Sequence, residues 1–386
     1  MLFRFAAPIA FAAATLGGAF YGFGSATAAP DAGLKISEPV LHENLAVYLV
    51  RGPSTPGAVP ATLEEALLKS TIIVHETGSV SELQIENTGS EPVFVQFGDI
   101  VKGGRQDRVL TSSLLIPPKS GKVAIGAYCV EQGRWAKRGV EDVTKFSAST
   151  AQIFSREAKV AIARAPIAAE ARRTAQPSEL ARPNLSARGD VEQQRQRDVT
   201  QRQAVQQQSG GGSGQGEVWR SVAAVQGLLG DKLAAPVESE KSRTSLQLTL
   251  ENERLKEAQQ GFITALEPKG LDGDDVVGVV IAVNGKIASA DIYPSNGLFR
   301  KMWPKLIRAA STDAFAHRVD AAQPAPATPT VAQAETFLAD AQNGDVRERA
   351  LADIAHHETR VSPNVLAVEA RTAKGAWIHR NFLSAK

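Results

Sequence analysis

Two polar segments of this sequence carry the residue types best suited to bind or transform a ligand. The first, FGDIVKGGRQDR, begins at the end of an apolar run and spans residues 97–108. Its two adjacent glycines let the backbone take angles that other residues avoid. The arginine and amide side chains that follow offer forked donors, which suit carboxylate or phosphate groups. The residues of interest in this segment are Gly103, Gly104, Arg105, Gln106 and Arg108.

The second polar segment, CVEQGRW, spans residues 129–135 and follows the next apolar run. If the two runs pair as antiparallel strands, the start of one lies near the end of the other. That pairing would bring the arginines of the first segment towards Glu131 and Arg134. The sequence therefore predicts that both segments form one polar corner.

This corner has two interpretations. In the first it is a pocket for an anion or a nucleotide-like ligand, and Trp135 is a stacking platform. In the second it is a structural ion-pair corner, in which Glu131 neutralises an arginine and the glycines form a β-bulge. Ion-pair networks are common in folded proteins, so the sequence favours the second interpretation. The ligand-binding hypothesis assigns the site to Gly103, Gly104, Arg105, Gln106, Arg108, Glu131, Arg134 and Trp135.

Other motifs predict no chemistry. The run His356-His357-Glu358 lacks the i, i+4 histidine spacing of a zinc peptidase, so we expect no metal site there. The sequence contains no Gly-x-Ser-x-Gly nucleophile motif, and its Gly/Ser-rich run lacks the Gly-Lys-Ser/Thr of a phosphate-binding loop. The catalytic residues thus stay unknown, and we predict no cofactor. The sole cysteine, Cys129, cannot form an internal disulfide and is expected to be buried, because apolar residues flank it.

The N-terminal residues have the pattern of a cleavable signal peptide. Arg4 supplies a positive charge, Phe5–Phe23 is apolar, and Ala26-Thr27-Ala28 forms a small-x-small cleavage site. We therefore expect residues 1–28 to be removed and the mature protein to be periplasmic or extracellular. The alternative is a retained anchor, because the apolar run approaches the ~20 residues that span a bilayer. No later segment predicts a membrane span.

Composition restricts the remaining classes of function. The chain has 386 residues, a formal net charge of +2 and 43% hydrophobic residues. So small a charge argues against nucleic-acid binding, whereas the hydrophobic fraction is enough for a real core. At roughly 100–200 residues per domain, two folded units are expected.

The residues from 29 to 145 are predicted to be rich in β-structure. Short apolar runs with Gly, Pro and Asn between them are typical of a β-sandwich or a partly open barrel. One strand is expected over Val109–Ile116 and another over Val123–Val130. Leu63–Lys69 is expected to be a helical insertion, with Thr62 as its cap.

The residues from 146 to 216 read as a low-complexity insertion. The first part is rich in Ala, Arg and Gln, and its end, Ser209–Gly216, is a Gly/Ser-rich linker. A stretch with so few apolar side chains buries too little surface to offset the entropy of ordering. We expect a solvated and partly disordered loop, and the sequence leaves open whether part of it is helical.

The residues from 217 to 386 predict an α+β region. A helix is expected from Val218 to Leu229, and a second one over about Leu246–Leu266. The turn Asn284-Gly285 joins two apolar runs in a β-hairpin. The helix that follows should kink or break at Pro304. A helix is then expected over Val331–Ala341. A second hairpin, with strands over Val365–Arg371 and Ala376–Leu383, completes the chain. We expect its final strand to pair into the main sheet. The fold class is thus α+β, with a β-sandwich-like or partly open barrel region followed by helices and hairpins that complete a second sheet.

Three stretches of the chain resemble a known family, the ARG and rhodanese-phosphatase-superfamily-associated domain, whose function is largely unknown. They are GDIVKGGRQDRVL, LLIPPKSGKVAIGAYCVEQGRW and GVVIAVNGKIASADIYPSNGLFRKMWPKLI, and the likeness extends from about Leu34 to Phe382. The family's name records a genomic association with ADP-ribosylglycohydrolases. The resemblance therefore implies a tie to NAD or ADP-ribose metabolism, but no catalytic mechanism.

Together these features predict an exported, non-enzymatic binding or scaffold domain with an anion-binding corner. Its expected partner is a small anionic ligand, not nucleic acid, and its protein partners are unknown. The alternative is a hydrolase or transferase that acts on a phosphorylated or ADP-ribose-like ligand. In that alternative, Arg105, Arg108 and Arg134 would clamp the anion and Glu131 would be the general base.

Overall fold

The computed structural model of the chain describes residues 33–134, 138–152, 155–175, 214–319, 326–351 and 353–386. The predicted signal peptide, Trp135 and most of the Arg/Gln-rich insertion lie outside these ranges. The protein is an α+β structure with a strand-rich N-terminal part, as the sequence predicts. Among the described residues, no helix has the length and apolar character needed to cross a bilayer.

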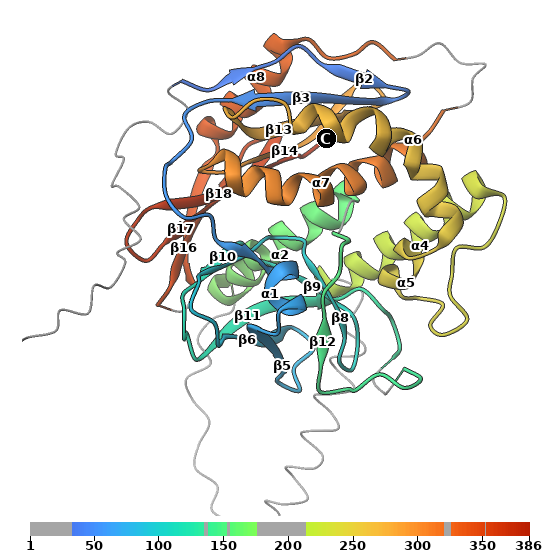
Figure 1. Cartoon of the computed structure of the whole chain (residues 1–386), viewed down its shortest axis with the longest axis vertical. Helices are drawn as coiled ribbons and strands as arrows, with labels where there is room; N and C mark the ends of the chain where they lie inside the picture. Colours follow the sequence, from blue (N-terminus) through green and yellow to red (C-terminus); the bar gives the residue numbers. More distant parts are fainter. Residues whose placement is uncertain (1–32, 135–137, 153–154, 176–213, 320–325, 352) are drawn as a thin grey trace, which may run out of the picture.

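A large antiparallel sheet occupies the upper half of the molecule as drawn in Figure 1. Its strand order is β1-β3-β13-β14-β18-β17-β16-β15, and β2 also pairs with β3. The strands from the N-terminal part are β1 (Lys35–Ile36), β2 (Val40–His42) and β3 (Leu45–Arg51). The others are β13 (Val276–Val283), β14 (Lys286–Ile292), β15 (Asp345–Leu351), β16 (Ala355–Val361), β17 (Val365–Thr372) and β18 (Trp377–Ser384). Strands β1, β2 and β3 thus pair with strands from the C-terminal part of the chain. The sequence predicted instead that they belong to the β-rich region of residues 29–145.

The hairpin β13–β14 forms as predicted, and Asn284 and Gly285 both have positive φ, 48° and 71°. These angles match the type I′ turn that the Asn-Gly pair favours. Strand β13 is buried along its whole length, because both faces of the sheet are covered at this point. The predicted pairing of the final strand into the main sheet is also confirmed, since β18 lies between β14 and β17.

The smaller sheets form a barrel-like unit in the lower half of Figure 1. One has the order β10-β7-β4 and the other β12-β8-β9-β11-β6-β5. Their strands are β4 (Ala61–Thr62), β5 (Ile72–Glu76), β6 (Glu82–Asn87), β7 (Val93–Val95), β8 (Ile100–Gly103), β9 (Arg108–Leu110), β10 (Leu114–Ile116), β11 (Lys122–Cys129) and β12 (Phe146–Ser147). Helix α1 (Leu63–Leu68) packs on them, and Thr62 and Glu65 form a capping box at its start.

The prediction of one strand over Val109–Ile116 is wrong. This stretch forms β9 and β10, which belong to different sheets. Between them the backbone turns at Thr111–Ser113, where the N–H of Thr111 still bonds the Gly126 carbonyl but Ser112 and Ser113 leave the ladder. A continuous apolar pattern gives no sign of such a turn in the backbone, because the residues before and after it face the same core.

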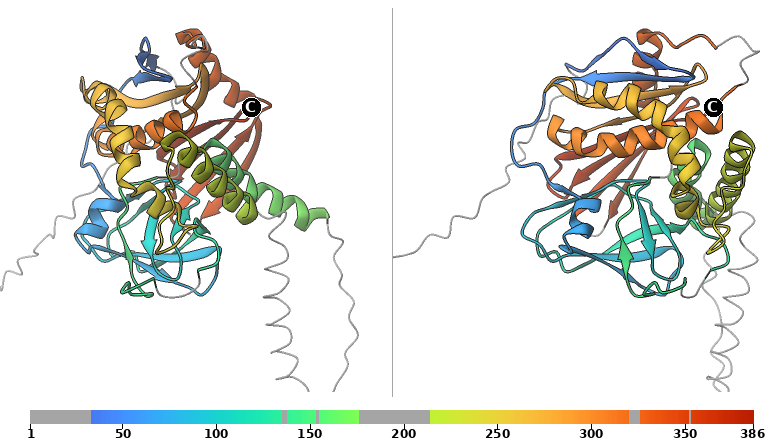
Figure 2. Two further views of the ribbon diagram at one scale, coloured as in Figure 1. Left: turned by 90° about the vertical axis from the view of Figure 1, so that its right-hand side faces the viewer. Right: turned by 45° about the vertical axis from the view of Figure 1, so that its right-hand side comes forward.

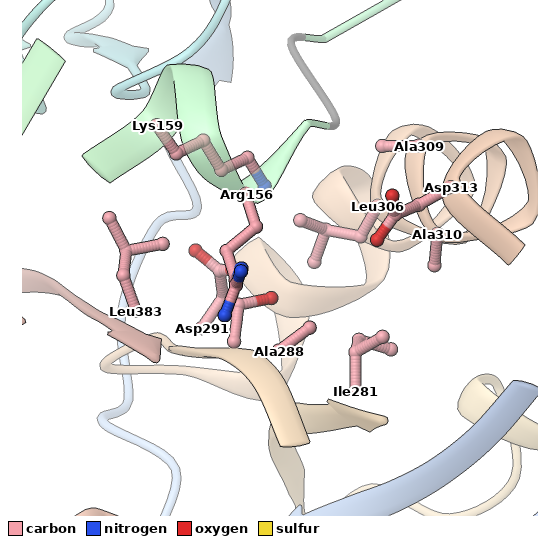
Figure 3. Close-up of a pocket in the computed structure, with 11 residues that line it drawn as sticks. Arg156, Lys159, Ile281, Ala288, Asp291, Leu306, Ala309, Ala310, Asp313 and Leu383 are labelled. Carbon is pink, nitrogen blue, oxygen red and sulfur yellow. The ribbon is translucent and has the colours of Figure 1, made fainter. Parts of the chain in front are cut away.

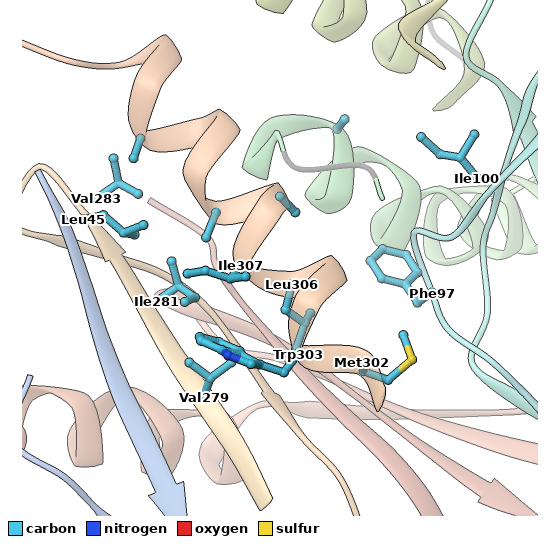
Figure 4. Packing of buried hydrophobic residues seen from close by; sticks show 14 of the residues in the cluster. Leu45, Phe97, Ile100, Val279, Ile281, Val283, Met302, Trp303, Leu306 and Ile307 are labelled. Atoms are coloured by element: carbon cyan, nitrogen blue, oxygen red, sulfur yellow. The ribbon is translucent and has the colours of Figure 1, made fainter. Parts of the chain in front are cut away.

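Helices cover both faces of the large sheet. Helix α7 (Asn296–Ala316) lies along one face beside α6 (Glu253–Gly270), and α8 (Val331–Asp340) lies on the other face. Helix α2 (Arg156–Ala175) lies between the large sheet and the barrel-like unit, whereas α4 (Gly214–Leu233) and α5 (Leu246–Leu250) stand at the side of this junction, as Figures 1 and 2 show. Figure 4 shows the core that results, with side chains of α7, β3 and β13 packed together and Phe97 approaching from the barrel side.

Three helix predictions need correction. The helix expected over Leu246–Leu266 is split into α5 and α6, because Asn252 caps a new helix with its side chain. Pro304 does not break α7, which continues from Asn296 to Ala316. The predicted Gly/Ser linker is partly helical, since α4 begins at Gly214. Within the Ala/Arg/Gln-rich stretch, Arg156–Ala175 forms α2, which resolves that part of the open question in favour of a helix.

Candidate functional site

The two polar segments meet at one corner of the barrel-like unit. The predicted antiparallel pairing is confirmed, since Cys129 of β11 lies opposite Arg108 of β9. Residues 131 and 134 follow β11 directly, so they fold back over the loop that joins β8 to β9. We call this set the arginine corner: Gly103, Gly104, Arg105, Gln106, Asp107, Arg108, Cys129, Glu131, Arg134 and Arg138.

Two buried carboxylates and two arginines form the centre of the arginine corner. The guanidinium of Arg138 donates to both carboxylate oxygens of Asp107, at 2.8 and 3.1 Å. Arg134 Nε lies 2.7 Å from Glu131 Oε1. Asp107 also accepts hydrogen bonds from the N–H of Gly103 at 2.9 Å and from the hydroxyl of Ser245 at 2.7 Å. Each carboxylate in this centre is therefore neutralised from within the protein.

A second layer of the arginine corner surrounds Arg108, which is fully buried. Its guanidinium donates to Gln106 Oε1 at 3.3 Å, contacts Cys129 Sγ and lies 3.7 Å from Glu76 Oε2. Cys129 is buried, as predicted. Burial, offset only in part by the charge of Arg108, raises the pKa of the Cys129 thiol to about 11, so the thiol is protonated at neutral pH.

The remaining predicted residues shape the loop. Gly103 and Gly104 both have positive φ, at 115° and 54°, and their carbonyls accept from Arg134 at 3.3 and 3.1 Å. The backbone N–H of Arg105 donates to Glu76 at 2.8 Å, and its side chain is exposed. Trp135 lies outside the described residues. The close internal pairing supports the interpretation of the arginine corner as architecture, whereas ligand binding there stays a prediction.

A different group of polar residues lies on the face of the large sheet that meets the barrel-like unit. Asp291 of β14 is directly opposite Asn381 of β18 in the sheet register. His379 lies two residues before Asn381, so its side chain emerges on the same face. All three are at least 95% buried. A titratable cluster in so apolar a setting is a candidate functional site.

Ser113, in the loop between β9 and β10, completes a line of hydrogen bonds with two of these residues. Its Oγ lies 2.9 Å from His379 Nδ1, and His379 Nε2 lies 3.1 Å from Asp291 Oδ1. Ser113 Oγ also accepts from the N–H of Phe97 at 2.9 Å. Asp291 Oδ1 accepts in addition from Asn381 Nδ2 at 2.9 Å. We call Ser113, His379 and Asp291 the serine line.

Positive charge lies close to the acidic end of the serine line. Burial alone would raise the pKa of Asp291, but the hydrogen bond and charge of His379, together with Lys159, hold it below its ordinary value. Figure 3 shows Arg156 and Lys159 extending from α2 beside Asp291, at a small cavity of about 20 Å³. Asp291 is therefore ionised at neutral pH. Its carboxylate can accept a hydrogen bond from a protonated ring nitrogen of His379.

A second small pocket, of about 70 Å³, lies at the serine end of this line. Ser112 and Ser113 line it from the barrel, and Arg347, Arg349 and His357 line it from the sheet edge. The guanidinium of Arg349 donates to Ser112 Oγ at 3.3 Å, and His357 Nε2 donates to the Ser113 carbonyl at 2.8 Å. Burial lowers the pKa of His357 to about 4, so its ring is neutral at physiological pH.

The opposite face of the large sheet carries a larger cleft, of about 350 Å³, beside α8 and the short helix η2 (Ala341–Asn343). Its charged lining consists of three arginines and two glutamates: Arg360, Arg371, Arg380, Glu358 and Glu369. Its apolar lining comes from both the helix and the strands: Leu338, Ala341, Ala367, Val368 and Phe382. We call it the arginine cleft. Its volume lies in the range of ordinary small-molecule sites.

The charges in the arginine cleft are arranged along neighbouring strands. Glu369 of β17 pairs with Arg380 of β18 at 2.7 Å and also contacts Arg371. Arg360 of β16 pairs with Glu358 at 2.5 Å, and both side chains remain partly exposed. Arg380 is 4% exposed, and its guanidinium lies 4.7 Å from the ring centre of Trp377. With three arginines against two glutamates, the lining has an excess positive charge.

Sequence reasoning missed the serine line and the arginine cleft. Strand β16, which carries Glu358 and Arg360 of the cleft, and strand β15 at the edge of the sheet were not predicted. One usable signal was present, because Asp291 is the one acidic residue within the apolar strand pattern after Asn284-Gly285. A buried charge needs partners, so this position alone points to an internal site. Across the described ranges, no three His, Cys, Asp or Glu residues gather in a metal-binding arrangement.

Comparison with known proteins finds one family. The family model described as ARG and Rhodanese-Phosphatase-superfamily-associated Protein domain matches residues 33–383. No curated protein and no solved structure matches the chain significantly. The matched range contains the barrel-like unit and nearly all of the large sheet.

Proposed function

This chain belongs to the ARG and rhodanese-phosphatase-superfamily-associated protein family, and we propose that it is an exported protein that binds a small organic anion in the arginine cleft. Support for export comes from the signal-peptide pattern of residues 1–28. Support for binding comes from one observation: a cleft of about 350 Å³ in which three arginines face two glutamates.

The lining of the arginine cleft suits an anion with an apolar portion. A guanidinium offers planar, forked donors that match carboxylate or phosphate oxygens. Arg360 and Arg371 are partly exposed, so a ligand can reach them without disrupting the core. The apolar side chains of Leu338 and Phe382 would contact the remainder of the ligand. Both glutamates of the cleft are paired with arginines, so we assign binding of the ligand, rather than chemistry on it, to this cleft.

The arginine corner is the competing place for an anion. There, however, Arg134 and Arg138 are already held by Glu131 and Asp107, which are themselves fully buried. An incoming anion would have to displace an internal carboxylate and leave it uncompensated, which costs several kcal/mol. For the same reason Glu131 is poorly placed to be a general base, so the corner gives little support to a hydrolase that uses it.

A thermal-shift screen tests the proposal with ADP-ribose, AMP, glucose 6-phosphate and inorganic phosphate as probes. A ligand at one hundred times its dissociation constant stabilises the folded state by about 2.7 kcal/mol. Arg360→Ala should abolish the shift of the best probe. Arg254→Ala, at an exposed position on α6, is the matched control and should leave the shift unchanged. A shift that survives Arg360→Ala but disappears in Arg105→Ala would move the site to the arginine corner.

A further inference from the structure

The serine line has the connectivity of an activated nucleophile, and it lies on the opposite face of the sheet from the arginine cleft. We propose that Ser113 is an acylable nucleophile that hydrolyses short-chain esters, with His379 as its base and Asp291 as the group that orients the base. The inference is independent of the proposed function, because no residue of the serine line lines the arginine cleft.

The hydrogen bonds fix the direction of proton transfer. Asp291 is ionised and can only accept, so the nitrogen of His379 that faces it, Nε2, carries the proton. In the neutral ring the other nitrogen, Nδ1, carries no proton and can accept a hydrogen bond from the hydroxyl of Ser113, whose Oγ lies 2.9 Å away. Serine hydrolases use the same order of groups, with the roles of the two nitrogens exchanged. Geometry and roles, rather than sequence position, define such a set of residues.

The pocket beside Ser113 restricts the acyl group. Its volume of about 70 Å³ is well below that of an ordinary small-molecule site, which favours an acetyl or similarly short acyl group. Arg347, Glu348 and Arg349 line this pocket at the exposed edge of the sheet, so these three residues together carry one net positive charge. The alcohol part of the substrate would therefore lie against a rim with a net positive charge. We infer that it is an acetyl or similarly short ester of an anionic alcohol.

The reaction balances with water as the only co-substrate. Ser113 Oγ attacks the ester carbonyl carbon while its proton moves to His379 Nδ1. The bond from this carbon to the alcohol oxygen breaks, and the alcohol leaves with the proton from Nδ1, so that Ser113 carries the acyl group. Water then attacks the acyl carbon and gives a proton to Nδ1. Cleavage of the bond to Ser113 Oγ returns that proton to the serine and releases the carboxylic acid.

The test uses p-nitrophenyl acetate as the probe and the full chain as the enzyme. We expect release of p-nitrophenol and, after acid quenching, an acetyl group on Ser113 in peptide mass spectra of the unmutated protein. Ser113→Ala should lower the turnover rate by at least about 100-fold. Ser90→Ala is the matched control, because this serine is exposed in the turn between β6 and β7 and does not line the pocket beside Ser113, and it should retain turnover.

Two results would overturn the inference. One is the absence of acetyl-Ser113 in the unmutated protein, which does not depend on whether a variant folds. The other is equal turnover by the Ser113→Ala and Ser90→Ala variants when circular dichroism shows both to be folded. Either result would make the serine line a structural link between the barrel-like unit and the large sheet. Absence of esterase activity would not bear on anion binding by the arginine cleft. Conversely, Arg360→Ala should not change the rate of ester turnover.

Discussion

Replacement of Arg138 by methionine should destabilise the protein by about 3–5 kcal/mol, because it removes one partner of a buried ion pair. The Arg138 side chain is 2% exposed, and it donates to both oxygens of Asp107. It also lies 3.6 Å from Glu131. Burial would lower the pKa of Arg138, but the hydrogen bond and charge of Asp107 raise it above the ordinary range, so the side chain remains charged. The variant would leave two fully buried carboxylates with Arg134 as the nearest cation.

Urea unfolding monitored by circular dichroism measures this effect. The midpoint should fall strongly for Arg138→Met and stay almost constant for Arg254→Met, since exposed substitutions usually change stability by less than about 0.5 kcal/mol. Combining Arg138→Met with Asp107→Asn should cost less than the sum of the single effects, because the second change removes the stranded charge. A cost below about 1 kcal/mol for Arg138→Met would refute the structural account of the arginine corner.

Three further predictions concern single residues. Gly103→Ala should cost more than about 1 kcal/mol in a urea titration, since φ is 115° and the added Cβ would lie 2.7 Å from the Lys145 carbonyl oxygen; an unchanged midpoint would contradict this. Cys129 should react with a thiol reagent only upon unfolding, because it is buried and its pKa is about 11; prompt labelling of the native protein would show otherwise. The pKa of His357 is depressed from 6.5 to about 4, so its contribution to stability is complete above pH 6.5 and is lost as the pH falls towards 4. In His357→Gln, the loss of unfolding free energy between pH 6.5 and pH 4 should be smaller by about 3 kcal/mol. An unchanged dependence of this free energy on pH would show that other groups cause the acid sensitivity.

Much of the fold could be predicted from local sequence signals. Asn284-Gly285 predicted a tight hairpin, and Thr62 predicted the start of α1, because both signals act over a few residues. Pairing between distant segments could not be predicted in this way. Strand β3 pairs with β13, more than two hundred residues later, and no local pattern specifies that partner. Strands β15 and β16 were missed because they are polar and carry little of the expected alternation.

The site was harder to predict than the fold. The polar segments of the arginine corner were found because their residues are close in sequence, and their proximity follows from one antiparallel pair. The serine line joins residues 113, 291 and 379, which only the packing of the barrel-like unit on the large sheet brings together. Asp107 and Arg138 complete the corner, but neither was singled out. Their importance depends on burial, which the sequence of a polar loop does not reveal.

Isothermal titration of the best anionic probe against the full chain and its Arg360→Ala, Arg105→Ala and Arg254→Ala variants tests the central claim most directly. The arginine cleft predicts that binding is lost in Arg360→Ala alone, and that rising salt weakens it in the other three proteins. Binding that is retained in Arg360→Ala and lost in Arg105→Ala would contradict the claim and place the anion at the arginine corner. Absence of binding by the unmutated protein to every probe would contradict it as well.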